Sequence, residues 1–511
     1  MGEPSYSLPN DVQQLKQLVH SQQKQILLLS EQLRLFKHAR FAPSSEKGGP
    51  DQITIFNEAE VLAAEPPPSD SEGNAEVEAE KPAQQQRGKR KPLPEQLPRI
   101  DIVHDLSEHE KQCACGCLKE QIGEDASEQL DIIPAKVQVL RHIYPKYCCP
   151  SCDDGGIQKA RPLPSPIPKS NVSPGLLAYI ITAKFVDALP LYRQGNIFGR
   201  MGIELSDTTM ARWVIQAANL IQPLLNLMAD VLMSHDILAI DETTTQVLRE
   251  NGRTAQSKSF MFVRQGGPPE QPVILYHYSP SKAQTVSDSL LEGFNGYLQS
   301  DGYQVYGKFS QSHEGVTSIG CWAHARRKFK DATNAQGKVT GHAAQGLKYI
   351  NELYRIEKIA ADATSEQRYV LRQEKAKALL EKIHHWLENL YPKVPNKTAL
   401  GKALTYLHNQ WDSLVGYIDD GRLRIDNNLT ENAIRPFAVG RKNWMFSTSP
   451  AGAGASAAFY SLVESAKANQ LEPYGYLRHI FKELPKATTI EAFEALLPWS
   501  VDKNINSDAE T

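Results

Sequence analysis

The stretch ILAIDET, residues 237–243, determines the fold and the chemistry that we expect of this chain. An apolar run that ends in an acidic residue, here Asp241, is typical of a buried strand with a polar side chain at its tip. The stretch LQSDGY, residues 298–303, repeats this arrangement with Asp301. Two aspartates at the tips of two strands predict a shared cation site at one edge of a sheet.

A third carboxylate lies in the stretch DNNLTEN, where Asp426 could cap a short helix that carries Glu431. Asp241, Asp301 and Glu431 could converge on two divalent cations, Mg²⁺ or Mn²⁺, which activate a water or hydroxyl and stabilise the leaving oxygen in phosphodiester cleavage. A lone Asp after a strand is most often a turn former or a cap, so the prediction depends on all three occurring in this order. Glu242 and Asp426 are rival ligands, although Glu242 should point away from Asp241.

The pattern around these carboxylates is that of a mixed sheet flanked by helices, as in ribonuclease H-like nucleases. The expected strands cover residues 237–240, 259–263, 273–278, 297–299 and 316–322, and the expected helices cover 281–294 and 323–332. We therefore predict the first part of a catalytic core at 235–335, an α-helical insertion at 336–420, the second part of the core with Glu431 at 421–485, and a C-terminal tail at 486–511.

Length and composition set broad limits. A chain of 511 residues is too long for one hydrophobic core, so we expect a multidomain α/β protein. No apolar run approaches the roughly 18 residues of a membrane helix and no signal segment is recognisable, so we expect a cytoplasmic protein with no membrane partner. A net charge of −3 argues weakly against a general polyanion binder. Contact with DNA must then come from local basic groups, namely Arg326, Arg327, Arg435, Arg441 and Lys442.

The N-terminal segment, residues 8–40, has the pattern of a coiled-coil helix. Apolar residues recur at alternating steps of four and three from Val12 to Phe36, with Gln22 as the single polar residue of the seam. A helix packed on its own protein is the alternative. Residues 41–98 are rich in Pro, Glu, Gln and Ser and are expected to form a flexible linker, which offers no packing surface. We therefore favour self-association into a homo-oligomer.

Residues 99–160 contain six of the seven cysteines, and a reducing cytosol disfavours disulfides. Two thiolate pairs can close a tetrahedral structural Zn²⁺ site in a small zinc-binding domain. Cys149 and Cys152 have the usual spacing for one pair. We expect Cys113 and Cys115 to complete the site, with Cys117 as an alternative ligand, and buried thiols without metal as the alternative to zinc.

Residues 170–234 read as a helical region. Ser173 and the following Pro-Gly predict a helix start, a second helix runs near 192–201, Gly202 makes a turn, and Ser206 caps a third helix. A helix, a short Gly-containing turn and a capped helix suit a helix-turn-helix that binds DNA. Arg212 on the third helix is then a DNA-binding candidate, and plain helical packing is the alternative.

These motifs together resemble the transposases of the insertion sequence 66 family, which have an Asp-Asp-Glu catalytic core. The resemblance covers nearly the whole chain. It is carried by the zipper helix, Ile122-Gly123-Glu124-Asp125, the stretch from Gln129 to Ala135, the three carboxylate segments, Cys321-Trp322-Ala323-His324-Ala325-Arg326-Arg327-Lys328-Phe329, Ile434-Arg435-Pro436, Gly440-Arg441-Lys442-Asn443-Trp444 and Leu496-Leu497-Pro498-Trp499.

The resemblance implies that Asp241, Asp301 and Glu431 are the catalytic, metal-binding triad. The implied reaction is hydrolysis at the transposon ends to free a 3′-hydroxyl, followed by attack of that hydroxyl on target DNA, with two Mg²⁺ ions and no covalent protein–DNA intermediate. The zinc domain and the helix-turn-helix would hold the terminal repeats, the zipper would pair protomers, and small accessory proteins of the same element could take part.

Several basic residues near the triad have two possible roles. His324, Arg326 and Arg327 are expected to contact DNA or phosphate near the site, with core packing as the alternative. Arg435, one helical turn beyond Glu431, could bind phosphate or pair with that carboxylate.

Three rival functions remain open. A DNA end-binding or regulatory protein without catalysis would function without the carboxylates. A recombinase with a Ser or Tyr nucleophile needs Arg and His around that nucleophile and gives the metal-suited triad no task. A general nuclease is chemically possible but leaves the zipper, the zinc domain and the helix-turn-helix unexplained.

Overall fold

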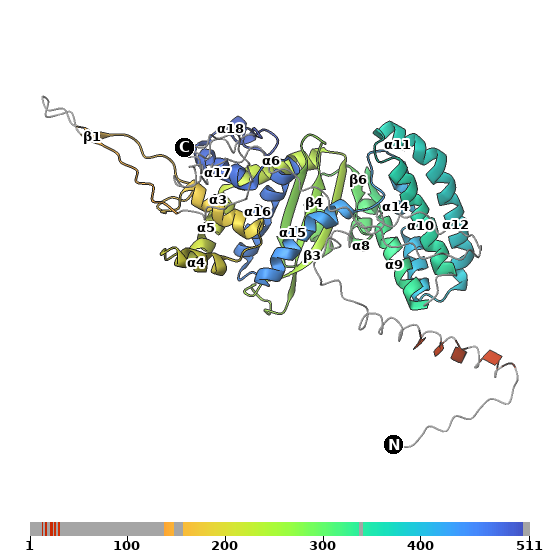
Figure 1. The fold of residues 1–511 in the computed structure, drawn as a ribbon. Helices are drawn as coiled ribbons and strands as arrows, with labels where there is room; N and C mark the ends of the chain where they lie inside the picture. Colours follow the sequence, from red (N-terminus) through yellow and green to blue (C-terminus); the bar gives the residue numbers. More distant parts are fainter. Residues whose placement is uncertain are drawn as a thin grey trace, which may run out of the picture. The chain divides into compact units, whose positions relative to one another are not determined.

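The computed structural model describes residues 137–147, 157–336 and 341–503, together with separate helical residues between 13 and 30. The chain divides into two units, one of residues 1–67 and 161–511 and the other of residues 68–160 (Figure 1). The second unit contributes one described antiparallel strand pair, β1 (Lys146–Tyr147) and β2 (Gln158–Lys159). The predicted zinc ligands and the predicted linker lie outside the described residues.

The predicted mixed sheet is present in the first unit. Its strand order is β5-β4-β3-β6-β7, with β3–β4 and β4–β5 antiparallel and β3–β6 and β6–β7 parallel. The strands are β3 (Ile237–Gln246), β4 (Lys258–Gly266), β5 (Val273–Ser279), β6 (Gly296–Gln299) and β7 (Val316–Ile319). Strand β3 runs past its expected end at Ile240 because it pairs with β4 as far as Gln246, opposite Lys258. The last strand is shorter than expected, since α9 begins at Trp322.

Two of the four helices before the sheet begin at the predicted caps, Ser173 and Ser206. Ser173 Oγ accepts the N–H of Leu176 and Ser206 Oγ accepts that of Thr209, as helix N-caps do. Gly202 has a φ of +78°, which favours glycine at this turn. The helices are α3 (Pro174–Phe185), α4 (Leu191–Arg200), α5 (Asp207–Leu220) and α6 (Gln222–Ser234). Their apolar faces share one hydrophobic core with the sheet and with α16.

Helices after the third carboxylate segment complete this core. They are α15 (Asn428–Trp444), α16 (Pro450–Ala468), α17 (Pro473–Glu483), η5 (Leu484–Lys486) and α18 (Ile490–Glu494). Helix α16 lies along the edge strand β5, where Ser465 Oγ accepts the N–H of Ile274 at 2.9 Å and Ser461 Oγ accepts that of Tyr276 at 2.7 Å. These hydroxyls satisfy an edge that would otherwise be open to further strand pairing. Leu496 in the predicted tail is buried in the same core.

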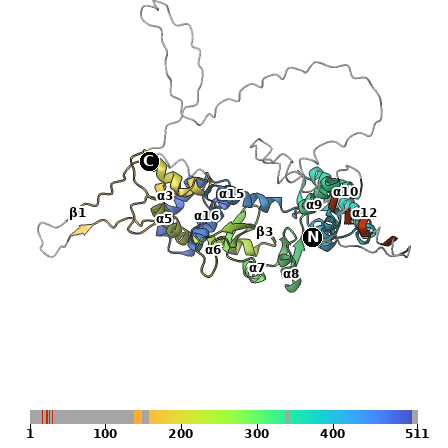
Figure 2. The same ribbon diagram turned by 90° about the horizontal axis from the view of Figure 1, so that it is seen from below.

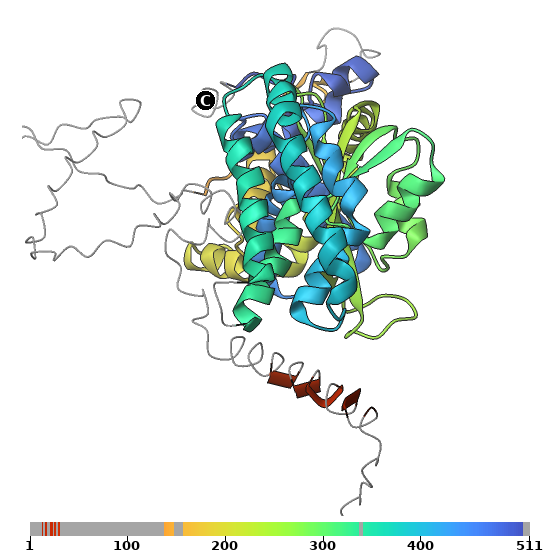
Figure 3. The same ribbon diagram turned by 90° about the vertical axis from the view of Figure 1, so that its right-hand side faces the viewer.

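The predicted insertion is helical and has a hydrophobic core of its own. It consists of α10 (His342–Ile359), α11 (Ser365–Leu371), the π-helix η2 (Arg372–Ala376), α12 (Lys377–Leu390), η3 (Tyr391–Lys393), α13 (Ala399–Asn409), α14 (Trp411–Val415) and η4 (Gly416–Ile418). Between the strands lie α7 (Gln284–Leu290), α8 (Gln304–Ser312) and α9 (Trp322–Gln336). Figures 1 and 2 show the insertion at one end of the sheet with α3 to α6 at the other, and in Figure 3 the insertion faces the viewer.

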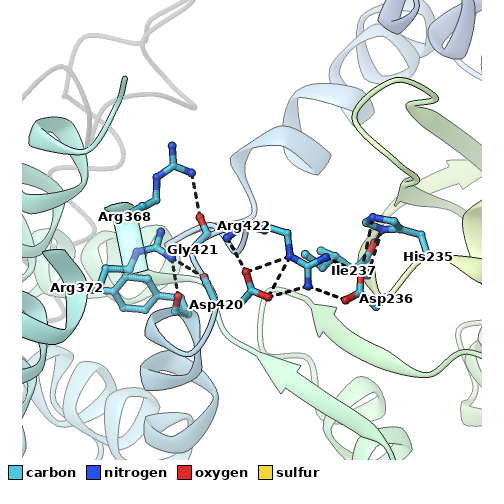
Figure 4. A network of polar contacts seen from close by, with 9 residues as sticks. His235, Asp236, Ile237, Arg368, Arg372, Asp420, Gly421 and Arg422 are labelled. Carbon is cyan, nitrogen blue, oxygen red and sulfur yellow. Dashed lines mark hydrogen bonds and ion pairs between the residues drawn. The ribbon is translucent and has the colours of Figure 1, made fainter. Parts of the chain in front are cut away.

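Two arginines hold the segment that connects the insertion to the third carboxylate (Figure 4). Arg372 is 1% exposed and pairs with Glu357 at 2.7 Å, and it also donates to the carbonyls of three residues, Tyr417, Asp420 and Leu423. Arg422 bridges Asp420 and Asp236 at the start of β3. The chain that leads into α15 is therefore fixed from both the insertion and the sheet.

No helix in the described ranges is both long and apolar enough to cross a membrane. The described residues between 13 and 30 are helical and exposed, and most positions of the predicted coiled-coil seam lie outside the described residues. The coiled coil therefore stays a prediction.

Candidate active site

The first carboxylate lies on β3, and the second follows the neighbouring parallel strand β6. Ala239 of β3 is paired in register with Gln299 of β6. Asp241 lies two residues beyond Ala239 and Asp301 two residues beyond Gln299, so both follow the last paired residues by the same step. Burial, and then the negative charge of Asp301, raise the pKa of Asp241 to about 8. The sheet thus brings together two of the three predicted ligands.

The third carboxylate comes from α15, which packs against β3. Glu431 is 6% exposed and lies in the first turn of this helix. Asn427 positions it, because the Asn427 carbonyl accepts the N–H of Glu431 at 3.1 Å while its side-chain amide donates to the carbonyl of Ile240 at 3.2 Å. The helix start is thereby attached to β3 one residue before Asp241. Burial raises the pKa of Glu431, and the charges of Asp426 and Asp301 add to this.

Asp426 does not occupy the N-cap position of α15, but its Oδ1 accepts the backbone N–H of Asn428, the first residue of the helix, at 3.2 Å. The N-cap position belongs to Asn427, one residue later. Asp426 is 5% exposed and accepts the hydroxyl of Tyr354 at 2.8 Å and the side-chain amide of Asn428 at 2.9 Å. These contacts attach the segment before Glu431 to α10 of the insertion, and they favour Glu431 over Asp426 as the third ligand.

The other rival, Glu242, also has partners of its own. It accepts the hydroxyl of Tyr306 at 2.5 Å and lies 3.8 Å from the ammonium of Lys282. Burial raises the pKa of Glu242, and its hydrogen bond from Tyr306 opposes that rise. Glu242 thus supports the Asp241 segment from the α8 side.

Helix α9 places a histidine and an arginine against Glu431. His324 Nδ1 lies 3.6 Å from Glu431 Oε1, and Arg327 Nη2 lies 3.4 Å from Glu431 Oε2. Burial, and then the charge of Arg327, lower the pKa of His324 to about 4, so the imidazole is neutral near pH 7. Both residues thus lie beside Glu431, and their contact with DNA stays a prediction.

Arg326 is placed differently from its two neighbours in sequence. It is 4% exposed, and its Nε donates to Asn351 Oδ1 of α10 at 2.9 Å. The predicted DNA contact is wrong for this residue, because the helix turns its side chain into the interface with the insertion. The alternative of core packing is the one observed.

Three of the remaining basic candidates lie on α15 and the fourth lies on α5. Arg441 of α15 is half-buried and donates to the hydroxyl of Thr244 at 3.3 Å, beyond Asp241 on β3. Lys442 is exposed and Arg435 is half-buried on the same helix. Arg212 is exposed on α5, whereas the next residue of that helix is buried in the core.

Sequence reasoning missed the contribution of the insertion to the second carboxylate. The hydroxyl of Tyr406 donates to the carbonyl of Asp301 at 3.0 Å, and Gln410 approaches the carbonyl of Gly302. A cavity of about 300 Å³ lies between these elements, lined by Gly302, Gln304, Asn396, Lys402, Thr405, Tyr406, Asn409 and Gln410. Tyr406 and Gln410 lie in a predicted helix, and nothing in their spacing indicated that they face the site.

Comparison with protein families gives matches along most of the chain. Residues 169–455 match the family described as Transposase IS66 family, and residues 461–499 match the IS66 C-terminal element. Residues 110–153 match the zinc-finger binding domain of transposase IS66, which indicates structural zinc. Residues 28–102 match a domain described as Transposase C of IS166 homeodomain, which overlaps the predicted linker.

Similar curated proteins come from Sinorhizobium fredii. The uncharacterized protein y4jD is 32% identical over 421 residues, which cover 80% of this chain and 81% of y4jD. The uncharacterized protein y4qI is 30% identical over 507 residues, which cover 96% of this chain and 92% of y4qI. No solved structure matches this chain.

Proposed function

Because the chain belongs to the IS66 transposase family, a DNA-binding family, we propose that it cleaves DNA at the ends of an insertion sequence and transfers them to target DNA. Asp241, Asp301 and Glu431 are the catalytic residues in this proposal. The observation that carries it is that Asp241 and Asp301 each lie two residues beyond the last pair of the parallel strands β3 and β6, with Glu431 held against β3 by Asn427.

The donor set fits hard divalent cations. Three carboxylates and no nitrogen or sulfur among the proposed ligands suit Mg²⁺ or Mn²⁺. The raised pKa of Asp241, which comes from burial and from the neighbouring carboxylates, marks a site where negative charge lacks compensation. Two bound cations would activate the attacking hydroxyl and stabilise the leaving oxygen.

The sheet supports this assignment. Its strand order, with two antiparallel pairs followed by two parallel pairs and the carboxylates on β3 and after β6, is the arrangement that we propose as a ribonuclease H-like core. The carboxylates would orient the water that cleaves the transposon end, and later the freed 3′-hydroxyl that attacks a target phosphodiester. In each step one P–O bond forms and one breaks, and the protein forms no covalent bond to DNA.

Basic side chains around the carboxylates would hold the DNA backbone. Arg327 is half-exposed beside Glu431, and Arg441 and Lys442 lie at the far end of α15. Contacts of this kind position the duplex and give salt-dependent affinity without sequence specificity. His324, in contact with both Glu431 and Arg327, would assist them, and Arg435 extends the same face of charge.

Binding of the terminal repeats is assigned to other parts of the chain. Helices α4 and α5 form the proposed helix-turn-helix, with Arg212 exposed on the second helix. A structural Zn²⁺ held by Cys113, Cys115, Cys149 and Cys152 would stabilise a second DNA-binding element. Residues 8–40 would pair protomers so that two ends are processed together, with small accessory proteins as possible further partners.

The test is cleavage of a DNA that carries the element's terminal repeats, with Mg²⁺ or with chelator. We expect wild-type protein to nick the 3′ ends only with Mg²⁺, and Asp301→Asn to bind the ends without nicking them. Asp331→Asn, the same substitution at an exposed position of α9, is the control and should retain cleavage. Equal cleavage by wild type and Asp301→Asn would remove Asp301 from catalysis and favour a non-catalytic end-binding protein.

A further inference from the structure

A thiol, an imidazole and a carboxylate gather at the junction of α9 and α15. Cys321 directly precedes α9, His324 lies in the first turn of that helix, and Glu431 faces them from α15. One ligand atom from each of these three residues lies within 4.8 Å of the other two. Cys321 is fully buried, and Glu431 is 6% exposed. This set differs chemically from the all-carboxylate triad, because it contains a sulfur and a nitrogen ligand.

Two of these ligand atoms are buried without a hydrogen bond. His324 Nδ1 and Glu431 Oε1 have no hydrogen-bond partner among the described residues, although buried polar atoms are normally paired. The two atoms are 3.6 Å apart, too far for a hydrogen bond between them. In a tetrahedral zinc site with metal–ligand bonds of about 2.1 Å, a nitrogen and an oxygen ligand lie about 3.4 Å apart. The observed separation is close to that value.

The same residue holds the sulfur and the carboxylate in place. The N–H of Asn427 donates to Cys321 Sγ at 3.3 Å, and the carbonyl of Asn427 accepts the N–H of Glu431. Burial raises the pKa of the Cys321 thiol and the N–H of Asn427 opposes the rise, so a bound metal ion would have to displace the thiol proton. The spacing of two residues between Cys321 and His324 places both ligands on one helical turn, as in many metal sites.

We propose that Cys321, His324 and Glu431 bind one transition metal ion of the Zn²⁺ class, with a fourth position open to water. Thiolate and imidazole ligands select Zn²⁺ over Mg²⁺, which prefers oxygen ligands. The site is therefore separate in chemistry from the proposed catalytic cation site, but the two share Glu431. Where the proposed function holds, Zn²⁺ bound here withdraws Glu431 from the catalytic set and inhibits DNA cleavage.

The test is the zinc content of the full-length chain, dialysed against Zn²⁺ buffered at low micromolar free concentration and measured by atomic emission. Wild type is compared with Cys321→Ser and His324→Gln. We expect each variant to bind one equivalent of Zn²⁺ per chain less than wild type, because each loses a ligand of the same site. His408→Gln, which changes an exposed histidine of α13, should retain the wild-type zinc content.

Zinc held by the predicted site of Cys113, Cys115, Cys149 and Cys152 is present in wild type and in these three variants, so it cancels in the comparison. Cys149→Ser should lower the total while leaving the equivalent that depends on Cys321 in place. Equal zinc content in wild type, Cys321→Ser and His324→Gln would overturn the proposal, and so would loss in Cys321→Ser with full retention in His324→Gln. The His324 variant guards against misfolding, since this side chain is partly exposed.

The zinc measurement uses no DNA, so its outcome is independent of the proposed function. Mg²⁺-dependent cleavage without a zinc equivalent that depends on Cys321 would leave the transposase proposal standing and overturn this inference. The converse result would leave the metal site established in a protein that does not cleave DNA.

Discussion

Asp301 follows β6 at the position that continues the pairing of Ala239 with Gln299, and it therefore lies beside Asp241 of β3. The electrostatic consequence is visible in the raised pKa of Asp241. Two carboxylates that repel each other are kept in place by parallel strands whose backbone hydrogen bonds cannot relax to separate them. A fold that maintains such repulsion needs a compensating positive charge, which is the physical argument for cation binding at this edge.

The first prediction concerns Asp241→Asn and the stability of the cation-free protein. The pKa of Asp241 is about 8 when folded and about 3.9 in an unfolded chain, so the folded state holds the proton more tightly and stability is lost as pH rises between these values. Asp241→Asn has no carboxyl group to ionise at this position, so it does not lose stability in this way as the pH rises. At pH 8.5 in chelator we expect its melting temperature to exceed that of wild type by at least about 2–4 °C, which is the shift that 1 kcal/mol gives in a domain of 150–250 residues.

The same comparison at pH 5 should show a smaller difference, because Asp241 of the folded wild type is then protonated. Mg²⁺ at pH 8.5 should raise the melting temperature of wild type more than that of the variant. Asp331→Asn provides the matched control. A difference between Asp241→Asn and wild type that is the same at both pH values would contradict this account.

Sequence patterns were sufficient to predict the strands and helices that carry the site. They failed where contacts between distant segments determine the direction of a side chain or the end of a strand. The apolar run that ends at Asp241 reveals its strand because burial on both faces of a central sheet leaves little room for polar residues. The direction of Arg326 could not be predicted, since Arg326 and Arg327 have the same charge and differ only in which side of α9 the insertion covers.

The extension of β3 past Ile240 was missed for a similar reason. Residues 241–246 are mostly polar and do not look like a buried strand, but pairing with β4 determines their conformation. The contacts of the insertion with Asp301 and Asp426 come from hydroxyls of Tyr406 and Tyr354, which are separated from them along the chain. A helical pattern predicts that such residues lie on helices and cannot tell what they face.

The second prediction tests the insertion as a positioning element for the second aspartate. Tyr406→Phe removes the hydroxyl that donates to the carbonyl of Asp301 and leaves the ring in place. Loss of one such bond costs about 0.5–1.5 kcal/mol in stability. If the proposed catalysis holds, we expect the single-turnover cleavage rate to fall about 3- to 10-fold, because misplaced catalytic groups lower rates steeply. Binding of DNA ends, measured by fluorescence anisotropy, should not change.

Tyr391→Phe is the control for this measurement, since it removes a tyrosine hydroxyl from the end of α12 in the same insertion. Equal cleavage rates of Tyr406→Phe and wild type would mean that Asp301 keeps its position without the insertion.

The third prediction separates two adjacent arginines. Arg326→Met removes a buried donor to Asn351, so we expect a loss of about 1–3 kcal/mol in the free energy of unfolding. Arg327→Gln changes a side chain that is 52% exposed, so we expect at most about 1 kcal/mol. Urea denaturation measures the free energy of unfolding of both variants.

The cleavage rate of DNA ends should be affected in the reverse order. We expect Arg327→Gln to lower this rate about 10- to 100-fold, because the Arg327 cation lies beside Glu431. A stability loss as large for Arg327→Gln as for Arg326→Met would refute the assignment of the two roles.

The fourth prediction compares two arginines that hold the segment leading to α15. Arg372 is almost fully buried, and its guanidinium neutralises Glu357 while donating to backbone carbonyls of the connecting segment. Arg372→Ala leaves the Glu357 carboxylate in the interior without its partner, which costs about 3–5 kcal/mol for a buried pair. Arg422 is 43% exposed and its ion pairs are open to water and salt, so Arg422→Ala should cost at most about 1 kcal/mol.

Because Arg372 fixes the chain that continues to Asp426 and Glu431, its loss should also reduce the Mg²⁺-induced rise in melting temperature, while Arg422→Ala should not. Urea denaturation and melting with and without Mg²⁺ test both expectations, and a similar stability loss for the two variants would show that the buried contacts of Arg372 do not hold this segment.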